Sequence, residues 1–159
     1  MNHSMLNSIG VCLCAAGAAP LAAQSAPAFI NPPGLSAPVG YTHLVDVPAD
    51  MRLVVISGQV SVDGSGKVIG VGDMTAQATQ VFENLKVALA AVGATFNDVI
   101  KLNTYLTSMA KSPSFRVVRD RYVNPKAPPA STTVEVRRLF RDEFLVEVEA
   151  IVAVPVKSP

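Results

Sequence analysis

The chain has 159 residues, about the length of one domain, and half of them are hydrophobic while only 16% are charged. It can therefore bury a real core, and intrinsic disorder is excluded for the bulk of it. The net charge is +1 with both signs interspersed, which argues against a nucleic-acid-binding stripe and against a polybasic membrane patch.

The N-terminal segment carries no Asp, Glu, Lys or Arg before Asp46. A short polar opening is followed by an apolar stretch from Ile9 to Ala19 and then by Pro20 and small residues, which is the layout of a secretory signal peptide. We predict a signal peptide over residues 1–25 and a periplasmic or secreted protein with no membrane attachment after cleavage. The n-region lacks Lys and Arg, so a leader without a targeting role, in a cytoplasmic protein, is the alternative.

Residues 26–40 are uncharged and rich in proline and glycine, which predicts an extended arm. Residues 41–159 are expected to form a single domain. Its β-branched runs predict strands over 41–47 and 52–62, and the sequence DGSG at 63–66 predicts the turn that follows.

The remainder of the domain alternates helical and strand patterns. Asp73 is a suitable cap for a helix that ends near Gly93. Ser112 is expected to cap a second helix, with Pro113 at its first position, and this helix should run to about Val123. Strands are predicted over 98–109, 132–138 and 144–154. The order ββαβαββ predicts an α+β fold, a two-layer sandwich with two helices on one face of a mostly antiparallel sheet.

The last predicted strand places Glu147 and Glu149 on one face together with apolar residues, while its other face is wholly apolar. The second face belongs in the core. A face that mixes carboxylates with apolar side chains is either solvated or part of a subunit interface that holds a polar cleft.

Arg119 lies on the apolar stripe of the second helix, where a buried guanidinium needs an anionic partner. Its stem could cover apolar surface while the head reaches water, or it could pair with a glutamate of the sheet. The more specific hypothesis is that Arg119 binds the carboxylate of a ligand.

Several segments resemble the RidA/YjgF reactive-intermediate deaminase family: ISGQV at 56–60, FRVVRDRY at 115–122, PPASTTVEVRRL at 128–139 and VEVEAIVAV at 146–154. The resemblance implies a chorismate-mutase-like α+β sandwich that assembles as a homotrimer with ligand clefts between subunits. It also implies a small-molecule ligand and no cofactor. The charge pattern already argues against nucleic acid, and no cluster of His, Cys and Asp has the spacing of metal ligands.

The resemblance further implies the hydrolysis of a 2-imino or enamino acid to the 2-oxo acid and ammonia. Glu147 matches the glutamate that positions the attacking water and is the candidate catalytic residue. The candidate substrate-binding residues are Tyr41, Ser57, Gly58, Arg119, Ser131 and Thr133.

This chain departs from the family pattern at Ser131, which occupies the place of the arginine that holds the substrate carboxylate in active members. A serine hydroxyl lacks the charge and the reach of that arginine, so we expect deamination to be weak or altered. Two function classes stay open: a cofactor-free imine or enamine hydrolase, and a small-molecule binding or protective protein without turnover.

Overall fold

The computed structural model describes residues 25–156. The predicted signal peptide lies outside the described residues except for Ser25, so export stays a prediction. No helix in residues 25–156 is both long and apolar enough to cross a membrane.

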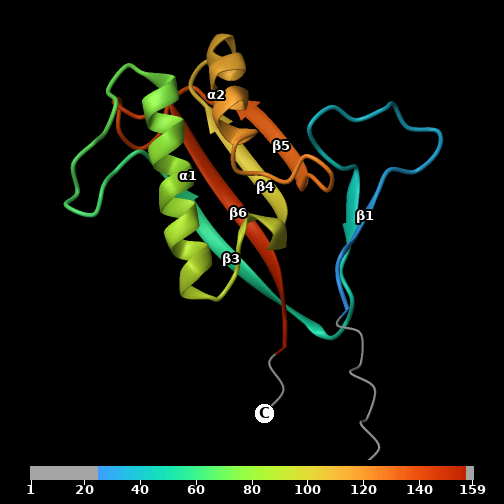
Figure 1. Ribbon diagram of the computed structural model, residues 1–159. Helices are drawn as coiled ribbons and strands as arrows, with labels where there is room; N and C mark the ends of the chain where they lie inside the picture. The colour runs from blue at the N-terminus through green and yellow to red at the C-terminus, as the bar shows by residue number, and fades with distance from the viewer. Residues whose placement is uncertain (1–24, 157–159) are drawn as a thin grey trace, which may run out of the picture.

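The main sheet has four strands in the order β3-β6-β4-β5, and Figure 1 shows helices α1 and α2 together in front of it. The strands are β3 (Met51–Gln59), β4 (Val99–Leu106), β5 (Ala130–Glu135) and β6 (Val146–Pro155). Strand β6 pairs antiparallel with β3 and with β4, whereas β4 and β5 are parallel. The predicted α+β fold, with two helices on one face of a mostly antiparallel sheet, is confirmed.

Helix α1 (Met74–Ala91) begins and ends where its caps predict. The Asp73 carboxylate accepts hydrogen bonds from the backbone N–H groups of Thr75 and Ala76, at 2.9 and 3.1 Å. At the other end Gly93 adopts a φ of 71°, a left-handed conformation that glycine reaches without steric cost.

Helix α2 (Ser112–Arg119) is shorter than predicted, and two expectations about it are wrong. Ser112 is not the cap: a short 3-10 turn, η2 (Met109–Lys111), precedes the helix, and Ser112 already has helical dihedral angles. The helix does not reach Val123, because its hydrogen bonds change to the tighter i to i−3 pattern, with Tyr122 N–H donating to the Arg119 carbonyl at 2.9 Å.

The predicted arm contains a short strand, β1 (Ala28–Ile30), which pairs antiparallel with β2 (Leu44–Asp46). The strand predicted at 41–47 is therefore short and belongs to this separate two-stranded ribbon rather than to the main sheet. Figure 1 shows β1 and its loop beyond β5, and the Thr42 N–H donates to the Pro129 carbonyl at 3.3 Å, which ties the ribbon to the start of β5.

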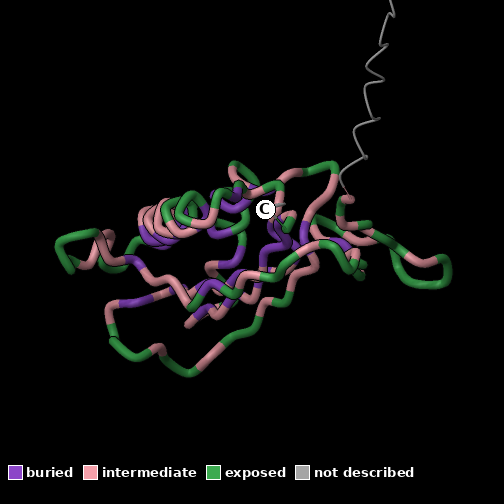
Figure 2. Tube along the Cα trace, turned by 90° about the horizontal axis from the view of Figure 1, so that it is seen from below, coloured by how far each residue is buried: buried purple, intermediate pink, exposed green. Residues whose placement is uncertain are grey.

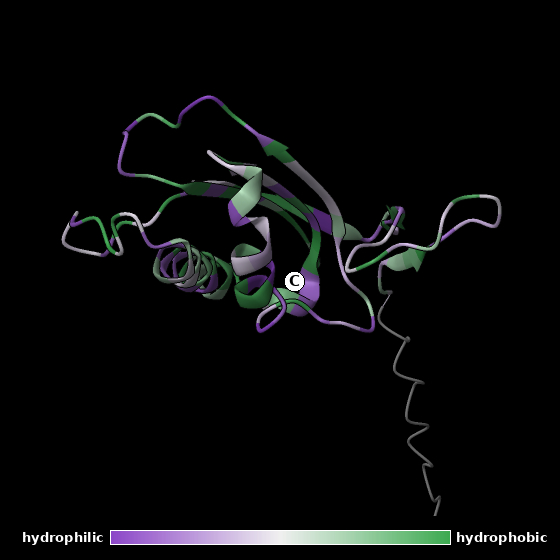
Figure 3. Cartoon of the chain, turned by 90° about the horizontal axis from the view of Figure 1, so that it is seen from above, coloured by the Kyte–Doolittle hydropathy of each residue, from purple (hydrophilic) through white to green (hydrophobic). Residues whose placement is uncertain are grey.

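The core lies between the helices and the sheet, where Figure 2 shows the buried residues concentrated, and Figure 3 shows hydrophobic segments in both layers. Phe82 of α1 is fully buried at its centre. Its ring stacks on Tyr122 with centroids 5.0 Å apart and contacts Phe115 of α2 at 6.0 Å and Phe96 at 5.9 Å. This aromatic cluster fixes the position of α2 against α1.

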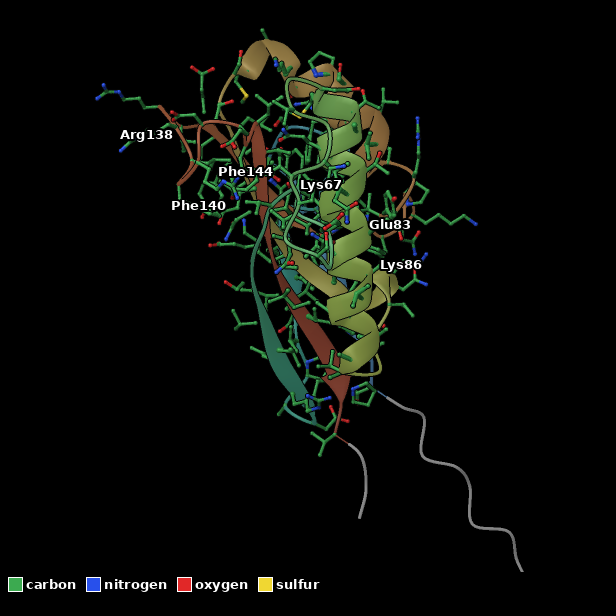
Figure 4. All side chains as sticks on the ribbon, turned by 90° about the vertical axis from the view of Figure 1, so that its left-hand side faces the viewer. Lys67, Glu83, Lys86, Arg138, Phe140 and Phe144 are labelled. Atoms are coloured by element: carbon green, nitrogen blue, oxygen red, sulfur yellow. The ribbon has the colours of Figure 1, made fainter. Side chains whose placement is uncertain are left out.

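The connection from β5 to β6 returns the chain to the centre of the sheet. Figure 4 shows Phe140 and Phe144 close together on the side away from α1, and their ring centroids are 4.9 Å apart. Gln77 of α1, itself fully buried, donates to the Glu143 carbonyl and accepts from the Leu145 N–H at 2.8 Å. These contacts fix where β6 begins, and with it the register of the glutamates that follow.

Replacing Phe82 with alanine should unfold the protein more easily, because it removes a fully buried ring whose neighbours cannot all close the gap. The expected loss is about 3–5 kcal/mol of unfolding free energy, measured by urea denaturation. Val87→Ala is the matched control, since Val87 lies in the same helix with 72% of its surface exposed. Equal losses in the two variants would contradict the assignment of Phe82 to the centre of the core.

Candidate functional site

The two faces of β6 differ as its alternating pattern predicts. Val146, Val148, Ala150 and Val152 are buried beneath the helices, whereas Glu147 and Glu149 are half-buried on the opposite face. We call this opposite side of the four-stranded sheet the open face. It also carries Leu53 and Val55 of β3, which are 58% and 76% exposed.

Glu149 is held by two side chains of the neighbouring strand β4. The Tyr105 hydroxyl donates to Glu149 Oε2 at 3.1 Å, and Asn103 Nδ2 donates to the same oxygen at 3.3 Å. Asn103 lies directly opposite Glu149 in the register, and Tyr105 lies opposite Glu147, so the tyrosine reaches Glu149 diagonally. The hydrogen bond to Glu149 is the main cause that raises the pKa of the Tyr105 phenol.

Glu147 has a different environment, since its carboxylate packs over the backbone of Gly58. A methyl group built at Gly58 would lie 2.7 Å from Glu147 Cδ and closer still to Oε1, so any larger residue here would have to displace the Glu147 carboxylate. Burial raises the pKa of Glu147, and the neighbouring Glu149 carboxylate adds to the rise.

A β-bulge brings Gly58 under Glu147. Ile56 pairs with Ala150 and Gln59 pairs with Val148, so that Ser57 and Gly58 together stand opposite Glu149. Beside the bulge is a hollow of about 340 Å³ on the open face, lined by Val55, Ile56, Ser57, Asn103, Glu149, Ala150 and Ile151. The structure therefore brings three predicted site residues, Glu147, Ser57 and Gly58, to one end of the open face.

The other four predicted residues gather in a second hollow of about 400 Å³, which we call the arginine pocket. It is lined by Ala37, Val39, Tyr41, Met109, Arg116, Arg119, Ser131 and Thr133. Helix α2 supplies the arginines, β5 supplies Ser131 and Thr133, and the loop before β2 supplies Tyr41. Residues far apart in the sequence thus form one cationic pocket.

Arg119 is 9% exposed and pairs with its neighbour in the sequence. Its Nε and Nη2 donate to Asp120 Oδ1 at 2.8 and 2.7 Å. A methyl group at Gly40, whose φ is 72°, would lie 2.5 Å from Nη2, so this loop closes tightly on the guanidinium. The partner is therefore Asp120, and the alternative of a sheet glutamate is wrong.

Sequence reasoning missed Asp120 as well as Asn103 and Tyr105. Adjacent residues within a helix do not face each other, but α2 ends at Arg119, and Asp120 is its C-terminal cap. The signal for the two β4 residues was the alternation of that strand, which places Asn103 and Tyr105 on one face. Only the pairing register of β4 with β6 shows that this face of β4 lies beside Glu147 and Glu149.

The two groups of site residues lie on opposite faces of the sheet. Thr132 is the register partner of Asn103, and its Oγ1 contacts Lys101 Nζ at 2.6 Å, so Thr132 shares the open face. Ser131 and Thr133 alternate with Thr132 and therefore point to the helix side. One chain by itself does not place Glu147 beside Ser131 or Arg119.

The described part of the chain contains no group of three or more His, Cys, Asp or Glu side chains arranged to hold a metal ion. The groups that residues 25–156 bring to the two hollows and the open face include the Glu147 carboxyl group with its raised pKa, the Tyr105 phenol, and the two arginines of the arginine pocket.

Comparisons with known proteins agree with the fold. Residues 34–154 match the model of the family described as endoribonuclease L-PSP. The crystal structure of YyfB from Yersinia pestis, a protein of unknown function of the conserved Rid protein family, superposes with a TM-score of 0.70 and 31% sequence identity. That match covers 80% of this chain and 98% of the YyfB chain.

Two curated relatives are similar over most of their length. Protein DfrA of Myxococcus xanthus is 38% identical over 111 residues, which are 70% of this chain and 82% of DfrA. The 2-iminobutanoate/2-iminopropanoate deaminase of Salmonella typhimurium is 29% identical over 133 residues, which are 82% of this chain and 94% of the deaminase.

Gly58→Ala should displace the Glu147 carboxylate without unfolding the protein, because the atom that must move is the end of a flexible side chain. A displaced carboxylate is better hydrated, so the pKa of Glu147 should fall toward its ordinary value. The measurement is a pH titration of ¹³C-labelled glutamate side chains by NMR.

Gly64→Ala is the control, since a methyl group at Gly64 would meet nothing within 4 Å. An unchanged Glu147 titration in Gly58→Ala, with the fold retained, would show that the contact between Gly58 and Glu147 does not set the environment of this carboxyl group.

Proposed function

The chain belongs to the RidA/YjgF family, and from that premise we propose that it binds a small carboxylate-bearing molecule in a cleft between two copies of itself and hydrolyses imines of this kind weakly. The observation that carries the proposal is Glu147, a half-buried carboxyl group of raised pKa on the open face. A carboxyl group with a pKa moved toward neutral can both accept and return a proton in water-dependent chemistry.

In the proposed reaction, Glu147 accepts a proton from water as the water oxygen bonds to the imine carbon. The C=N double bond becomes a single bond, and its electron pair goes to nitrogen, which takes up the proton that Glu147 received from water. When the C–N bond of the resulting carbinolamine breaks, Glu147 accepts the proton of the hydroxyl group as the carbonyl of the 2-oxo acid forms, and it gives this proton to the departing nitrogen, which leaves as ammonia. No redox partner is needed to balance these steps.

The arginine pocket is the proposed binding site for the substrate carboxylate. Arg119 and Arg116 supply positive charge, and the hydroxyls of Ser131 and Thr133 are hydrogen-bond donors. Because this pocket and Glu147 lie on opposite faces of one sheet, a ligand that touches both must lie between two chains.

The open face supports this two-chain arrangement. Val55 and Leu53 expose apolar surface there that a second copy could cover. A cyclic homotrimer, which the family resemblance implies, would place the open face of each chain against its neighbour.

Weak turnover is proposed because of Ser131 and Asp120. Ser131 offers a neutral hydroxyl in place of a bidentate cation, and Asp120 already occupies one edge of the Arg119 guanidinium. The same pairing is the observation that favours the second candidate, a binding or protective protein without turnover, since a carboxylate ligand has to compete with Asp120 for Arg119.

Ammonia release from freshly generated 2-iminobutyrate separates the two candidates. We expect a slow release by the unmodified protein and a faster release by Ser131→Arg, since the new guanidinium can hold the substrate carboxylate with two hydrogen bonds. The gain is expected to be about ten- to a hundred-fold in kcat/KM, the size typical of one charge-assisted contact.

Val117→Arg is the control, because Val117 is 59% exposed on α2 and is not among the residues that line the arginine pocket. Glu147→Gln should abolish release in either background. Rapid release by the unmodified protein, with kcat on the order of 1 s⁻¹ or more, would show that Ser131 is no handicap. No release by any variant would leave the binding function as the better candidate.

The proposed assembly gives a separate prediction. Light scattering of the mature protein should yield three times the mass of one chain, and Val55→Asp should dissociate it by burying a charge in an apolar contact. Val87→Asp, an exposed position on α1, should leave the mass unchanged. A monodisperse monomer at micromolar concentration would refute both the trimer and the cleft between chains.

A further inference from the structure

Two carboxylates share the open face, and they are not equivalent. Glu147 and Glu149 are two residues apart on β6, so their side chains emerge about 7 Å apart. Glu149 Oε2 accepts hydrogen bonds from both Tyr105 and Asn103, whereas the Glu147 carboxylate lies against the backbone of Gly58. The Glu149 carboxylate is therefore held by two hydrogen bonds, whereas the Glu147 carboxylate lies beside the bulge at Ser57 and Gly58.

The anchoring orients the carboxylate of Glu149. Asn103 presents its amide NH₂ group and Tyr105 presents its hydroxyl, so two donors of β4 converge on one carboxylate oxygen and hold this side chain toward β4.

Few other charges act on this pair. The titratable side chains that the four strands place on the open face are Lys101, Tyr105, Glu147 and Glu149. Lys101 is engaged with Thr132 Oγ1 on the far side of β4 from β6. On the β3 side, Leu53, Val55, Ser57 and Gly58 bring no charge.

We propose that Glu149, held by Tyr105 and Asn103, is a positioning residue whose oriented carboxylate acts on Glu147, and that Glu147, which lies against Gly58, is the carboxyl group that exchanges protons with the ligand. The inference rests on the proposed function and deepens it, since it divides the roles of two glutamates that the sequence alone does not distinguish.

The physical reason is that a carboxylate at this spacing disfavours the ionisation of its neighbour. Burial raises the pKa of Glu147, and the anion of Glu149 raises it further. The same anion raises the pKa of Tyr105, so both groups should respond together when the charge of Glu149 is removed.

The test is an NMR titration of the full mature chain, without ligand, with ¹³C labels at glutamate Cδ and tyrosine Cζ. In the unmodified protein, Glu147 and Tyr105 should both titrate above their ordinary pKa values. In Glu149→Gln, which keeps the size of the side chain, both titrations should move to lower pH. Glu147 should remain above its ordinary value, because its burial is unchanged.

Glu135→Gln is the matched control, because Glu135 lies at the end of β5 and accepts from the Met109 N–H at 2.6 Å rather than from the open face. It should leave both titrations where they are. Unchanged titrations in Glu149→Gln would overturn the proposal. If that variant does not fold, a Tyr105 phenol that titrates at its ordinary value in the unmodified protein overturns it equally.

This result is independent of turnover, because the titration is read without substrate. Failure of the proposed hydrolysis would show as absent ammonia release with the titrations as expected. Failure of the role of Glu149 would show as unmoved titrations in a protein that still releases ammonia.

Discussion

Strand β6 pairs with β3 along one edge and with β4 along the other, so its side chains can point only toward the helices or toward the open face. Val146, Val148, Ala150 and Val152 fill the first side and close the core. Glu147 and Glu149 therefore point to the open face, where their neighbours on β3 are apolar. The packing of the core thus fixes the position of the carboxylates, and the bulge at Ser57 and Gly58 gives one of them its particular environment.

Much of this arrangement could be predicted from the sequence, because it follows from local periodicity. The alternation along β6 predicts which residues are buried, and the Asp73 and Gly93 caps predict both ends of α1. The α2 helix was predicted too long, since the apolar spacing that reaches Tyr122 is also satisfied by a tighter final turn.

Other features depend on pairing between distant segments, which periodicity does not specify. The parallel register of β4 with β5 sends Ser131 to the helix side, and the shifted register of β3 with β6 puts Gly58 under Glu147. The pairing of Arg119 with Asp120 needs the exact end of α2, which no residue signal in the sequence marks. These are the features that separate the site into two halves.

Glu147 and the arginine pocket lie on opposite faces of the sheet, and this separation is explained if the protein works as an assembly of several copies. Each chain would contribute Glu147 to one cleft and the arginine pocket to another, and the exposed apolar surface of β3 would be covered in the process. Under the proposed function, serine at position 131 would weaken the binding of a substrate carboxylate and leave the environment of Glu147 unaltered. The fold would be retained while its chemistry is reduced or redirected.

The most direct test is a crystal structure of the mature protein soaked with 2-oxobutyrate, the product of the proposed reaction. The ligand should lie between two chains, with its carboxylate in the arginine pocket of one and its carbonyl carbon nearest Glu147 of the other. A ligand held wholly within one chain, or an open face that stays exposed in every assembly in the crystal, would contradict the cleft between chains.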